Sequence, residues 1–220
     1  MNTQLRQQII DIYRKRARNY DVTANLYYLF GYPEWAYRRR AVAALNLKPG
    51  DIVVEIACGT GLNFPLYQEA VGPTGKIIGV DLTDAMLEQA RQRGKDNSWD
   101  NVELVHSDAL AYQFPDGVDA VISTYALSLI PEADQVLDHA VKALAPGGRL
   151  ALLDLQIPAN WPAWLVSFGV WVMKPFAVKD EWIERRPWES IIQTMQNLLA
   201  DVTVSEMYLG LTYVIAGKKA

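Results

Sequence analysis

From residue 51 onward, short apolar runs alternate with segments of helix length. Five runs rich in Val, Ile and Leu lie at residues 52–56, 76–80, 102–105, 118–122 and 149–153. Such runs predict buried strands, and the segments between them, including 85–93 and 132–144, have the pattern of helices. The second of these helices is expected to end at the sequence Ala-Pro-Gly-Gly, residues 145–148. Strands that alternate with helices predict a parallel sheet covered by helices on both faces.

The C-terminal stretch has a different pattern. Residues 203–208 and 212–216 flank a short Leu-Gly-Leu segment and predict an antiparallel pair that completes the sheet. We therefore expect a Rossmann-like, doubly wound α/β fold, with a seven-stranded, mostly parallel sheet and an antiparallel C-terminal hairpin strand. The chain shows no internal repeat and no low-complexity linker, which favours a single domain over residues 1–220.

Two segments stand outside this sheet pattern. In residues 2–20, apolar residues recur at helical spacing between basic ones, which predicts a basic amphipathic helix. Its apolar positions are Leu5, Ile9, Ile12, Tyr13, Ala17 and Tyr20. Residues 157–188 form an insertion that holds five of the seven tryptophans, namely Trp161, Trp164, Trp171, Trp182 and Trp188. Trp164, Phe168 and Trp171 fall on one helical face, so we expect an apolar cap over the carboxyl edge of the sheet.

The composition is that of a soluble globular protein, since 50% of the 220 residues are hydrophobic and 21% are charged. The single cysteine, Cys58, excludes an intramolecular disulfide, and no Cys/His cluster is present, so no metal ligand is expected. The longest apolar stretch, residues 161–176, is interrupted by Pro162, Lys174 and Pro175 and is too short to span a membrane. With no apolar signal segment, these features predict a cytoplasmic protein and leave attachment to a membrane surface open.

Charge is distributed unevenly along the chain. Residues 1–50 carry nine Lys and Arg against three Asp and Glu, a net charge of +6, which leaves −10 for the rest of a chain whose total is −4. This asymmetry indicates that an anionic partner, such as a phospholipid surface, meets the N-terminal segment, unless the basic residues only solvate one helix face. A nucleic-acid partner is not expected, because the basic residues alternate with an apolar stripe and form no groove.

The first strand leads into a loop built from small residues. Its sequence is VEIACGTGLN, residues 54–63, and Ala57, Gly59 and Gly61 allow the backbone to turn sharply and to approach a ligand closely. Asp81 ends the second strand 20 residues after Gly61, where a carboxylate can bind the two hydroxyls of a ribose. Strand, loop, helix and strand-terminal acid together predict a nucleotide-type ligand, and the alternative is a tight turn with a capping Asp81.

The loop resembles motif I of the class I S-adenosylmethionine-dependent methyltransferases. Dinucleotide sites have a third glycine at the position that Leu62 occupies in this chain. The loop has instead the form E-x-A-x-G-x-G, and it departs from the family at Ala57, where glycine is frequent. Further matches to the family follow in order over residues 45–155. They are GVDL at 79–82 for the ribose, HSDA at 106–109 for the adenine, the strand-four segment 118–129, and LAPGGRL at 144–150.

This resemblance implies S-adenosylmethionine as cofactor and S-adenosylhomocysteine as product. It implies that residues 55–61 line the methionine portion, that Asp81 binds the ribose and that Asp108 accepts from the adenine amino group. Ser123 and Thr124 would face the transferred methyl. The full set implied for the cofactor is Tyr20, Glu55, Ala57, Cys58, Gly59, Thr60, Gly61, Asn63, Asp81, Leu82, Met86, Ser107, Asp108, Ala109, Ser123 and Thr124.

The N-terminal segment narrows the resemblance. The sequence RNYD at 18–21, the tyrosines at 27–28 and the sequence YRRR at 37–40 are similar to the "YD" segment of two groups. These are the ubiquinone/menaquinone methyltransferases and the bacterial phospholipid N-methyltransferases that act on phosphatidylethanolamine or the betaine-lipid head group. The resemblance implies that the first helix folds over the cofactor, with Tyr20 as a lid residue or else a core aromatic. Lys174, Lys179, Arg185 and Arg186 would add phosphate contacts.

We expect methyl transfer by in-line displacement to an amine of a lipid head group or of another amphipathic acceptor, which mainly requires that the two groups be held in line. The candidate catalytic residues are Tyr20, Tyr125 and Asp154, of which Asp154 ends the fifth strand and Tyr125 follows the fourth. One alternative is a soluble methyltransferase for a quinone-like or natural-product acceptor at O, N or C, for which the Trp-rich insertion closes a pocket. Another is a cofactor-binding protein without catalysis.

The expected division of the domain follows from these assignments. Residues 1–45 form an N-terminal helical lid, 46–156 the cofactor-binding core, 157–190 the substrate-cap insertion, and 191–220 the C-terminal helix and strands. The partners are a small molecule or a lipid, with an anionic membrane surface as a further one. The oligomeric state does not follow from the sequence.

Overall fold

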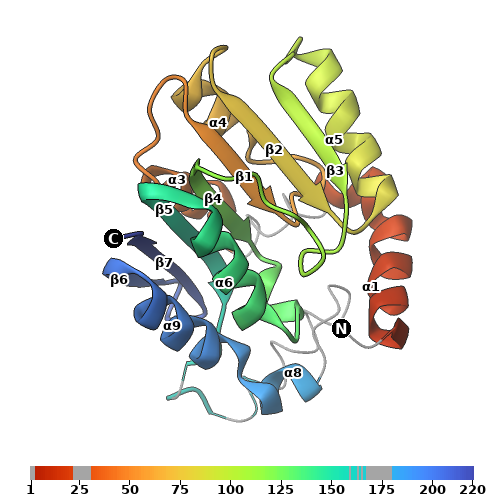
Figure 1. The fold of residues 1–220 in the computed structure, drawn as a ribbon. Helices are drawn as coiled ribbons and strands as arrows, with labels where there is room; N and C mark the ends of the chain where they lie inside the picture. Colours follow the sequence, from red (N-terminus) through yellow and green to blue (C-terminus); the bar gives the residue numbers. More distant parts are fainter. Residues whose placement is uncertain (1–2, 22–30, 159, 163, 165, 167–179) are drawn as a thin grey trace.

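The computed structural model describes residues 3–21, 31–158, 160–162, 164, 166 and 180–220. Its centre is one seven-stranded sheet with the order β3-β2-β1-β4-β5-β7-β6 (Figure 1). The strands are β1 (Ile52–Ile56), β2 (Lys76–Asp81), β3 (Val102–His106), β4 (Val118–Thr124), β5 (Leu144–Leu155), β6 (Ala200–Met207) and β7 (Thr212–Lys218). Only β7 pairs antiparallel with its neighbours β5 and β6. The predicted doubly wound α/β fold is confirmed.

The strand order reverses between β1 and β4. After β1 the chain moves outward to β2 and β3, and it then returns to place β4 on the other side of β1. The segments that leave the carboxyl ends of β1 and β4 therefore diverge, which is where doubly wound sheets bind their ligands. The fold itself thus fixes one position for a ligand site.

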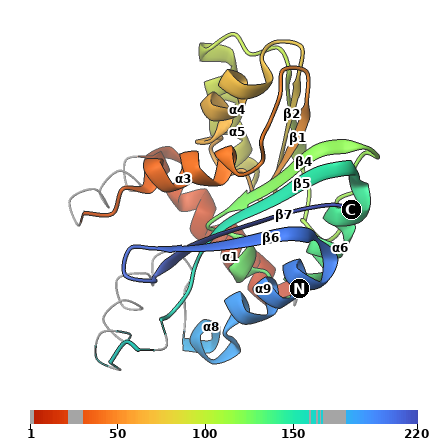
Figure 2. The same cartoon turned by 90° about the vertical axis from the view of Figure 1, so that its left-hand side faces the viewer.

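Alternate residues of the strands face two separate cores. Val54 and Ile56 point to a core closed by α6 (Ala133–Ala143) and α9 (Pro187–Leu198). Val53 and its strand neighbours point to a core closed by α3 (Glu34–Ala43), α4 (Phe64–Val71) and α5 (Asp84–Asp96). The two groups of helices lie on opposite sides of the twisted sheet (Figure 2). Burial on both faces explains why the strands have continuous apolar runs and not an alternating pattern.

The N-terminal segment forms α1 (Thr3–Arg16) and a 3₁₀ turn, η1 (Ala17–Asn19), in place of one continuous helix. Figure 1 shows α1 next to α5, at the end of the sheet where β1 and β2 finish. Ala17 is buried, in agreement with the apolar stripe. Residues 27 and 28 of the predicted N-terminal motif lie outside the described residues. None of the helices in the described part of the chain combines the length and apolar character needed to cross a membrane.

Residues 145–148 are predicted to form a turn between a helix and a strand, but in the structure they lie within β5. In the structure β5 already begins at Leu144, which pairs with Val118, and the register then shifts before Arg149 pairs with Ala120. Gly147 has a φ of +79°, so the glycines make an irregularity within the strand pairing and do not separate two elements.

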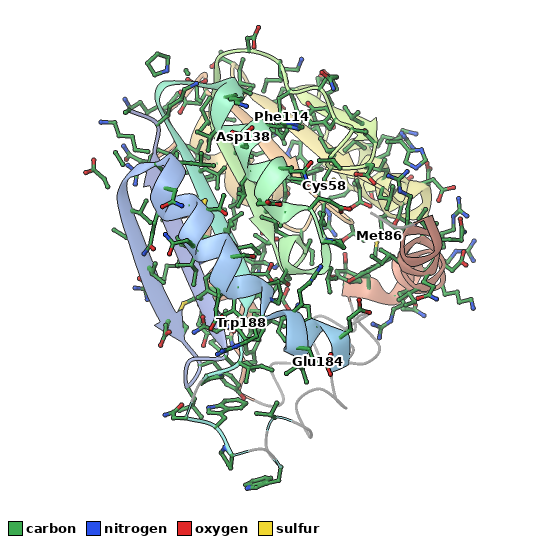
Figure 3. The ribbon with its side chains drawn as sticks, turned by 60° about the horizontal axis from the view of Figure 1, so that its bottom comes forward. Cys58, Met86, Phe114, Asp138, Glu184 and Trp188 are labelled. Atoms are coloured by element: carbon green, nitrogen blue, oxygen red, sulfur yellow. The ribbon has the colours of Figure 1, made fainter. Side chains whose placement is uncertain are left out.

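The tryptophans of the insertion have two different environments. Trp182 on α8 (Asp180–Arg185) and Trp188 on α9 are buried against each other, with ring centroids 4.9 Å apart, and belong to the core that α6 and α9 close. Trp188 is labelled in Figure 3. Trp164 is 71% exposed. Phe168, Trp171, Lys174 and Lys179 lie outside the described residues, so the apolar cap stays a prediction.

Close packing below the glycine loop gives a stability prediction. A Cβ added at Gly79, on β2, would lie 2.8 Å from Phe64 Cζ and 2.9 Å from Cys58 Sγ. Gly79→Ala should therefore lower the free energy of unfolding by about 1–3 kcal/mol, as overpacking does in a filled core. Denaturant unfolding measures this change.

Gly94→Ala in α5 is the matched control, because a Cβ there meets no atom within 4 Å. Alanine is the better helix former, so this variant should be neutral or more stable by up to about 1 kcal/mol. Equal stability of the two variants would contradict the packing argument.

Candidate functional site

The loop after β1 is held in a conformation that most residues avoid. Ala57, Gly59 and Gly61 all have positive φ, at +56°, +56° and +74°. The Cys58 N–H donates to Val80 O at 3.0 Å, and the Gly61 N–H donates to Cys58 O at 3.0 Å. A Cβ at Gly61 would lie 2.6 Å from the Phe64 ring, so only glycine fits there. The predicted sharp turn between strand and helix is present.

Asp81 ties this loop to the end of β2. Its carboxylate accepts from the Gly59 N–H and from the Thr83 N–H, both at 2.8 Å. Asp81 is buried, and burial raises its pKa although these hydrogen bonds lower it. Each oxygen keeps a lone pair beyond the backbone bond it accepts, so the carboxylate can also accept from hydroxyls of a ligand.

A pocket that is open to solvent lies at the carboxyl edge where β1 and β4 diverge. Most of the predicted cofactor residues line it, namely Tyr20, Ala57, Gly59, Asp81, Leu82, Met86, Ser107, Asp108, Ala109 and Thr124. Apart from Tyr125, the other lining residues are not among the individually predicted site residues. These are Ile9, Tyr13, Val80, Thr83, Ala126, Leu129 and Ile130.

The remaining predicted cofactor residues are absent from the pocket lining. Gly61 and Cys58 shape the loop, and Ser123 is buried one residue before Thr124. The Thr60 hydroxyl donates to Asp21 at 2.6 Å and so holds the N-terminal segment. Glu55 and Asn63 belong to a buried polar network under the pocket.

That network is centred on Arg38 of α3, which is only 5% exposed. Arg38 donates to Glu34 at 2.8 Å, to Thr124 Oγ1 at 2.8 Å and to Asn63 Oδ1 at 3.1 Å. Asn63 Nδ2 in turn donates to Glu55 Oε1 at 2.5 Å. Burial outweighs these contacts and raises the pKa of Glu55 to about 7. In the sequence Arg38 belongs to a basic run, and only its i, i+4 spacing from Glu34 hints at a buried pair.

The three candidate catalytic residues are not brought together. Tyr20 and Tyr125 line the pocket, and burial raises the pKa of Tyr20 to about 12. The Asp154 carboxylate instead accepts from the Ser128 N–H at 2.9 Å, the Ser128 hydroxyl at 2.8 Å and the Leu155 N–H at 2.8 Å. It holds the turn η3 (Leu127–Leu129) and is absent from the pocket lining, while burial raises its pKa to about 6.

Ion pairs fasten the N-terminal segment over the pocket. Arg14 donates to both carboxylate oxygens of Asp84, at 2.8 and 3.0 Å, and Asp21 pairs with Arg93 of α5. Arg6 pairs with Asp108, the carboxylate that the resemblance assigns to the adenine amino group. Ile9 and Tyr13 of α1 and Met86 of α5 line the pocket, and Figure 3 shows Met86 beside α1. No sequence pattern indicates the Arg6 pair, because it joins residues far apart in the chain.

The chain is similar to known methyltransferases over most of its length. Residues 1–178 match the model of the ubiE/COQ5 methyltransferase family. The chain belongs to this family. The demethylmenaquinone methyltransferase of Symbiobacterium thermophilum is 31% identical over 179 residues, which are 80% of this chain and 69% of that protein. The corresponding protein of Listeria welshimeri is 29% identical over 166 residues, 75% of this chain and 69% of that one.

A solved structure shows the same fold. Geranyl diphosphate C-methyltransferase from Streptomyces coelicolor A3(2) superposes with a TM-score of 0.70 at 17% identity, over 85% of this chain and 76% of that one. The ubiE/COQ5 chain described here is therefore a class I S-adenosylmethionine-dependent methyltransferase, as the motifs predict.

The residues present fit this cofactor. Gly59 lines the pocket, and a Cβ there would meet no protein atom within 4 Å, so the backbone is open to a ligand. Asp81 presents a carboxylate for the ribose hydroxyls, and Ser107, Asp108 and Ala109 form the wall on which the adenine is expected. We expect the ribose, adenine and methionine portions to follow these three parts of the pocket.

Asp81 provides the sharpest test of cofactor binding. Asp81→Asn replaces one carboxylate oxygen with an NH2 group, which faces a backbone N–H and cannot accept from it or from a ribose hydroxyl. S-adenosylhomocysteine should therefore bind at least about tenfold more weakly. Isothermal titration calorimetry measures the change in Kd.

Asp119→Asn is the matched control, because Asp119 accepts from the Ile52 N–H at 2.8 Å at the opposite, amino edge of the sheet. It should lose stability without a change in cofactor affinity. An unchanged Kd in Asp81→Asn would refute the ribose assignment.

Proposed function

We propose that this methyltransferase acts on the ring of a quinone-type acceptor that carries an apolar tail. The observation that carries the proposal is the similarity, over 75–80% of the chain, to proteins named demethylmenaquinone methyltransferases. The pocket supports it. Beyond Thr124 the wall consists of Tyr125, Ala126, Leu129 and Ile130, which suit a flat apolar ring.

The chain supplies binding and orientation. When bound, S-adenosylmethionine supplies an electrophilic methyl group on a sulfonium sulfur. Tyr13 and Tyr20 of the N-terminal segment line the pocket, and Tyr125 lines it at the end of β4. Side chains around an acceptor limit its motion and hold it in line with the methyl group, from which methyl transfer gains much of its rate.

A lipid amine, the first expectation from the sequence, is the second candidate. The basic residues of α1 favour it, because they suit an anionic lipid surface. An amine must lose a proton before it accepts a methyl group, and Asp154 is occupied by Ser128 and Leu155. The carboxylates in the described lining, Asp81 and Asp108, belong to the cofactor end. Methylation of a ring also releases a proton, from the ring carbon or from a hydroxyl, so it is the apolar wall of Ala126, Leu129 and Ile130 that favours the ring acceptor.

A labelling assay tests the acceptor. The protein is incubated with methyl-labelled S-adenosylmethionine and either a short-chain demethylmenaquinone, kept reduced in detergent micelles, or phosphatidylethanolamine vesicles. Label should enter the quinone, and Asp81→Asn should reduce its rate at least about tenfold at a limiting cofactor concentration. Label in phosphatidylethanolamine alone would replace this proposal with the lipid amine.

An acceptor with an apolar tail resides in membranes. We therefore also propose that the protein binds to the cytoplasmic face of a bilayer. Lys15 and Arg18 are exposed on the N-terminal segment and suit anionic lipid. Lys15→Glu with Arg18→Glu should strongly reduce cosedimentation with vesicles that contain phosphatidylglycerol. Arg14 is left unchanged, since its pair with Asp84 fastens the segment.

The matched control for the vesicle experiment is Lys48→Glu with Lys95→Glu. Both lysines are exposed and lie outside α1 and η1, and the change in net charge is the same. This variant should keep most of its binding. Equal losses in the two double variants would mean that net charge alone governs attachment.

A further inference from the structure

Three hydroxyl groups from distant parts of the sequence are joined by hydrogen bonds, and the last of them lies in the pocket. The Tyr32 hydroxyl donates to the Tyr125 hydroxyl at 2.8 Å and lies 2.8 Å from the Thr212 Oγ1. Thr212, at the start of β7, is fully buried, and Tyr32 is 8% exposed. Tyr125 follows β4 and lines the pocket.

The direction of donation along this line follows from counting hydrogens. A tyrosine hydroxyl has one hydrogen and can also accept. Tyr32 gives its hydrogen to Tyr125, so Thr212 is the donor in the bond with Tyr32. Tyr125 therefore accepts in this line and keeps its own hydrogen. Because Tyr125 lines the pocket, that hydrogen is available to a ligand.

The backbone and the surroundings of Tyr125 fix it in this place. Its φ of +57° is unfavourable for a tyrosine, and its N–H donates to Leu153 O at 2.7 Å. Strain of this kind persists only where neighbours hold the residue, and it concentrates at functional sites. Arg38 Cζ lies 5.1 Å from the centre of the Tyr125 ring, and Arg38 is itself held by Glu34 and Thr124.

Tyr125 is a hydrogen-bond donor at physiological pH. Burial raises the pKa of Tyr125 well above its ordinary value, so the hydroxyl keeps its proton. The Arg38 cation beside the ring acts in the opposite direction and lowers the pKa of Tyr125, because it stabilises negative charge on the oxygen, and this strengthens the hydroxyl as a donor. The one lone pair of a neutral amine must attack the methyl group and cannot also accept this hydrogen, whereas an oxygen atom of the acceptor can accept it.

We propose that Tyr125 donates a hydrogen bond to an oxygen atom of the methyl acceptor, and that Thr212 and Tyr32 fix the direction of this donation. The inference rests on the proposed function, because a quinone-type ring carries such oxygens, and it narrows the acceptor to an oxygen-bearing ring. Tyr125 is then the residue that determines specificity, and Tyr32 and Thr212 are positioning residues.

A matched pair of ring probes tests the donor. 1-Tetralone has one carbonyl oxygen that can only accept, and tetralin is its hydrocarbon counterpart. With S-adenosylhomocysteine present, the wild type should bind tetralone more tightly than tetralin by about tenfold, the size of one well-made hydrogen bond. In Tyr125→Phe this ratio should fall to about one. The affinity for tetralin in each variant reports whether the pocket is still formed.

Conservative variants test the positioning residues. In Thr212→Val the shape is kept, but Tyr32 loses its incoming donor and Tyr125 is free to turn its hydrogen back toward Tyr32. The preference for tetralone should fall partway in Thr212→Val and in Tyr32→Phe, and it should return in Thr212→Ser, which restores the hydroxyl. A purely structural role of Thr212 would make the valine variant equal to wild type, because valine has the same shape.

The outcomes separate this inference from the proposed function. A wild type without preference for tetralone, or a Tyr125→Phe variant that keeps the preference, overturns the inference. A wild type that prefers tetralone but does not methylate the reduced demethylmenaquinone leaves the inference supported and contradicts the proposed function. Methylation of the quinone with an unchanged kcat/KM in Tyr125→Phe contradicts the inference alone.

Discussion

The buried guanidinium of Arg38 is the constraint on which the pocket depends. A charge with 5% exposure is tolerated only when hydrogen bonds and an opposite charge replace the lost water. Glu34 supplies the charge, and Asn63 and Thr124 supply oxygens from the glycine loop and from β4. These bonds tie α3 to the carboxyl edge of the sheet, where the segments that leave β1 and β4 diverge. The floor of the pocket is thus one polar network inside an apolar frame.

The cover of the pocket is held by a different kind of interaction. Arg14 and Asp84 are about half exposed, and Asp21 and Arg93 are partly exposed. The Arg14 hydrogen bonds lower the pKa of Asp84, yet exposed pairs contribute little to stability because solvent and salt screen them. A weakly fastened segment over a rigid floor suits a site that must admit a cofactor and an acceptor in turn. Arg6 adds a specific feature, since its partner Asp108 lies in the wall expected for adenine.

Polarity changes along the pocket, from a polar end that suits the cofactor to a mostly apolar end that suits the acceptor. The carboxylates of Asp81 and Asp108 stand at the end that suits ribose and adenine, where donors of the ligand need acceptors. At the other end are hydroxyls and apolar side chains, with Tyr125 as the polar point. The position of Asp154 at the end of the fifth predicted strand predicts a carboxylate at this acceptor end. The structure uses Asp154 to fix η3, which carries Leu129 into the wall, so it supports the site from behind.

The sequence by itself determined what depends on local pattern. Continuous Val and Ile runs fixed the strands, and the small residues at 57, 59 and 61 with Asp81 fixed the cofactor loop, because each reports a backbone requirement of its own segment. Only the tertiary structure decided the contacts between distant segments. The burial of Arg38, the packing of Trp182 and Trp188 in the core and the line from Thr212 through Tyr32 to Tyr125 are of this kind. From the sequence, each of these side chains could equally be exposed or buried. Their surroundings form only when the sheet brings distant segments of the chain next to one another.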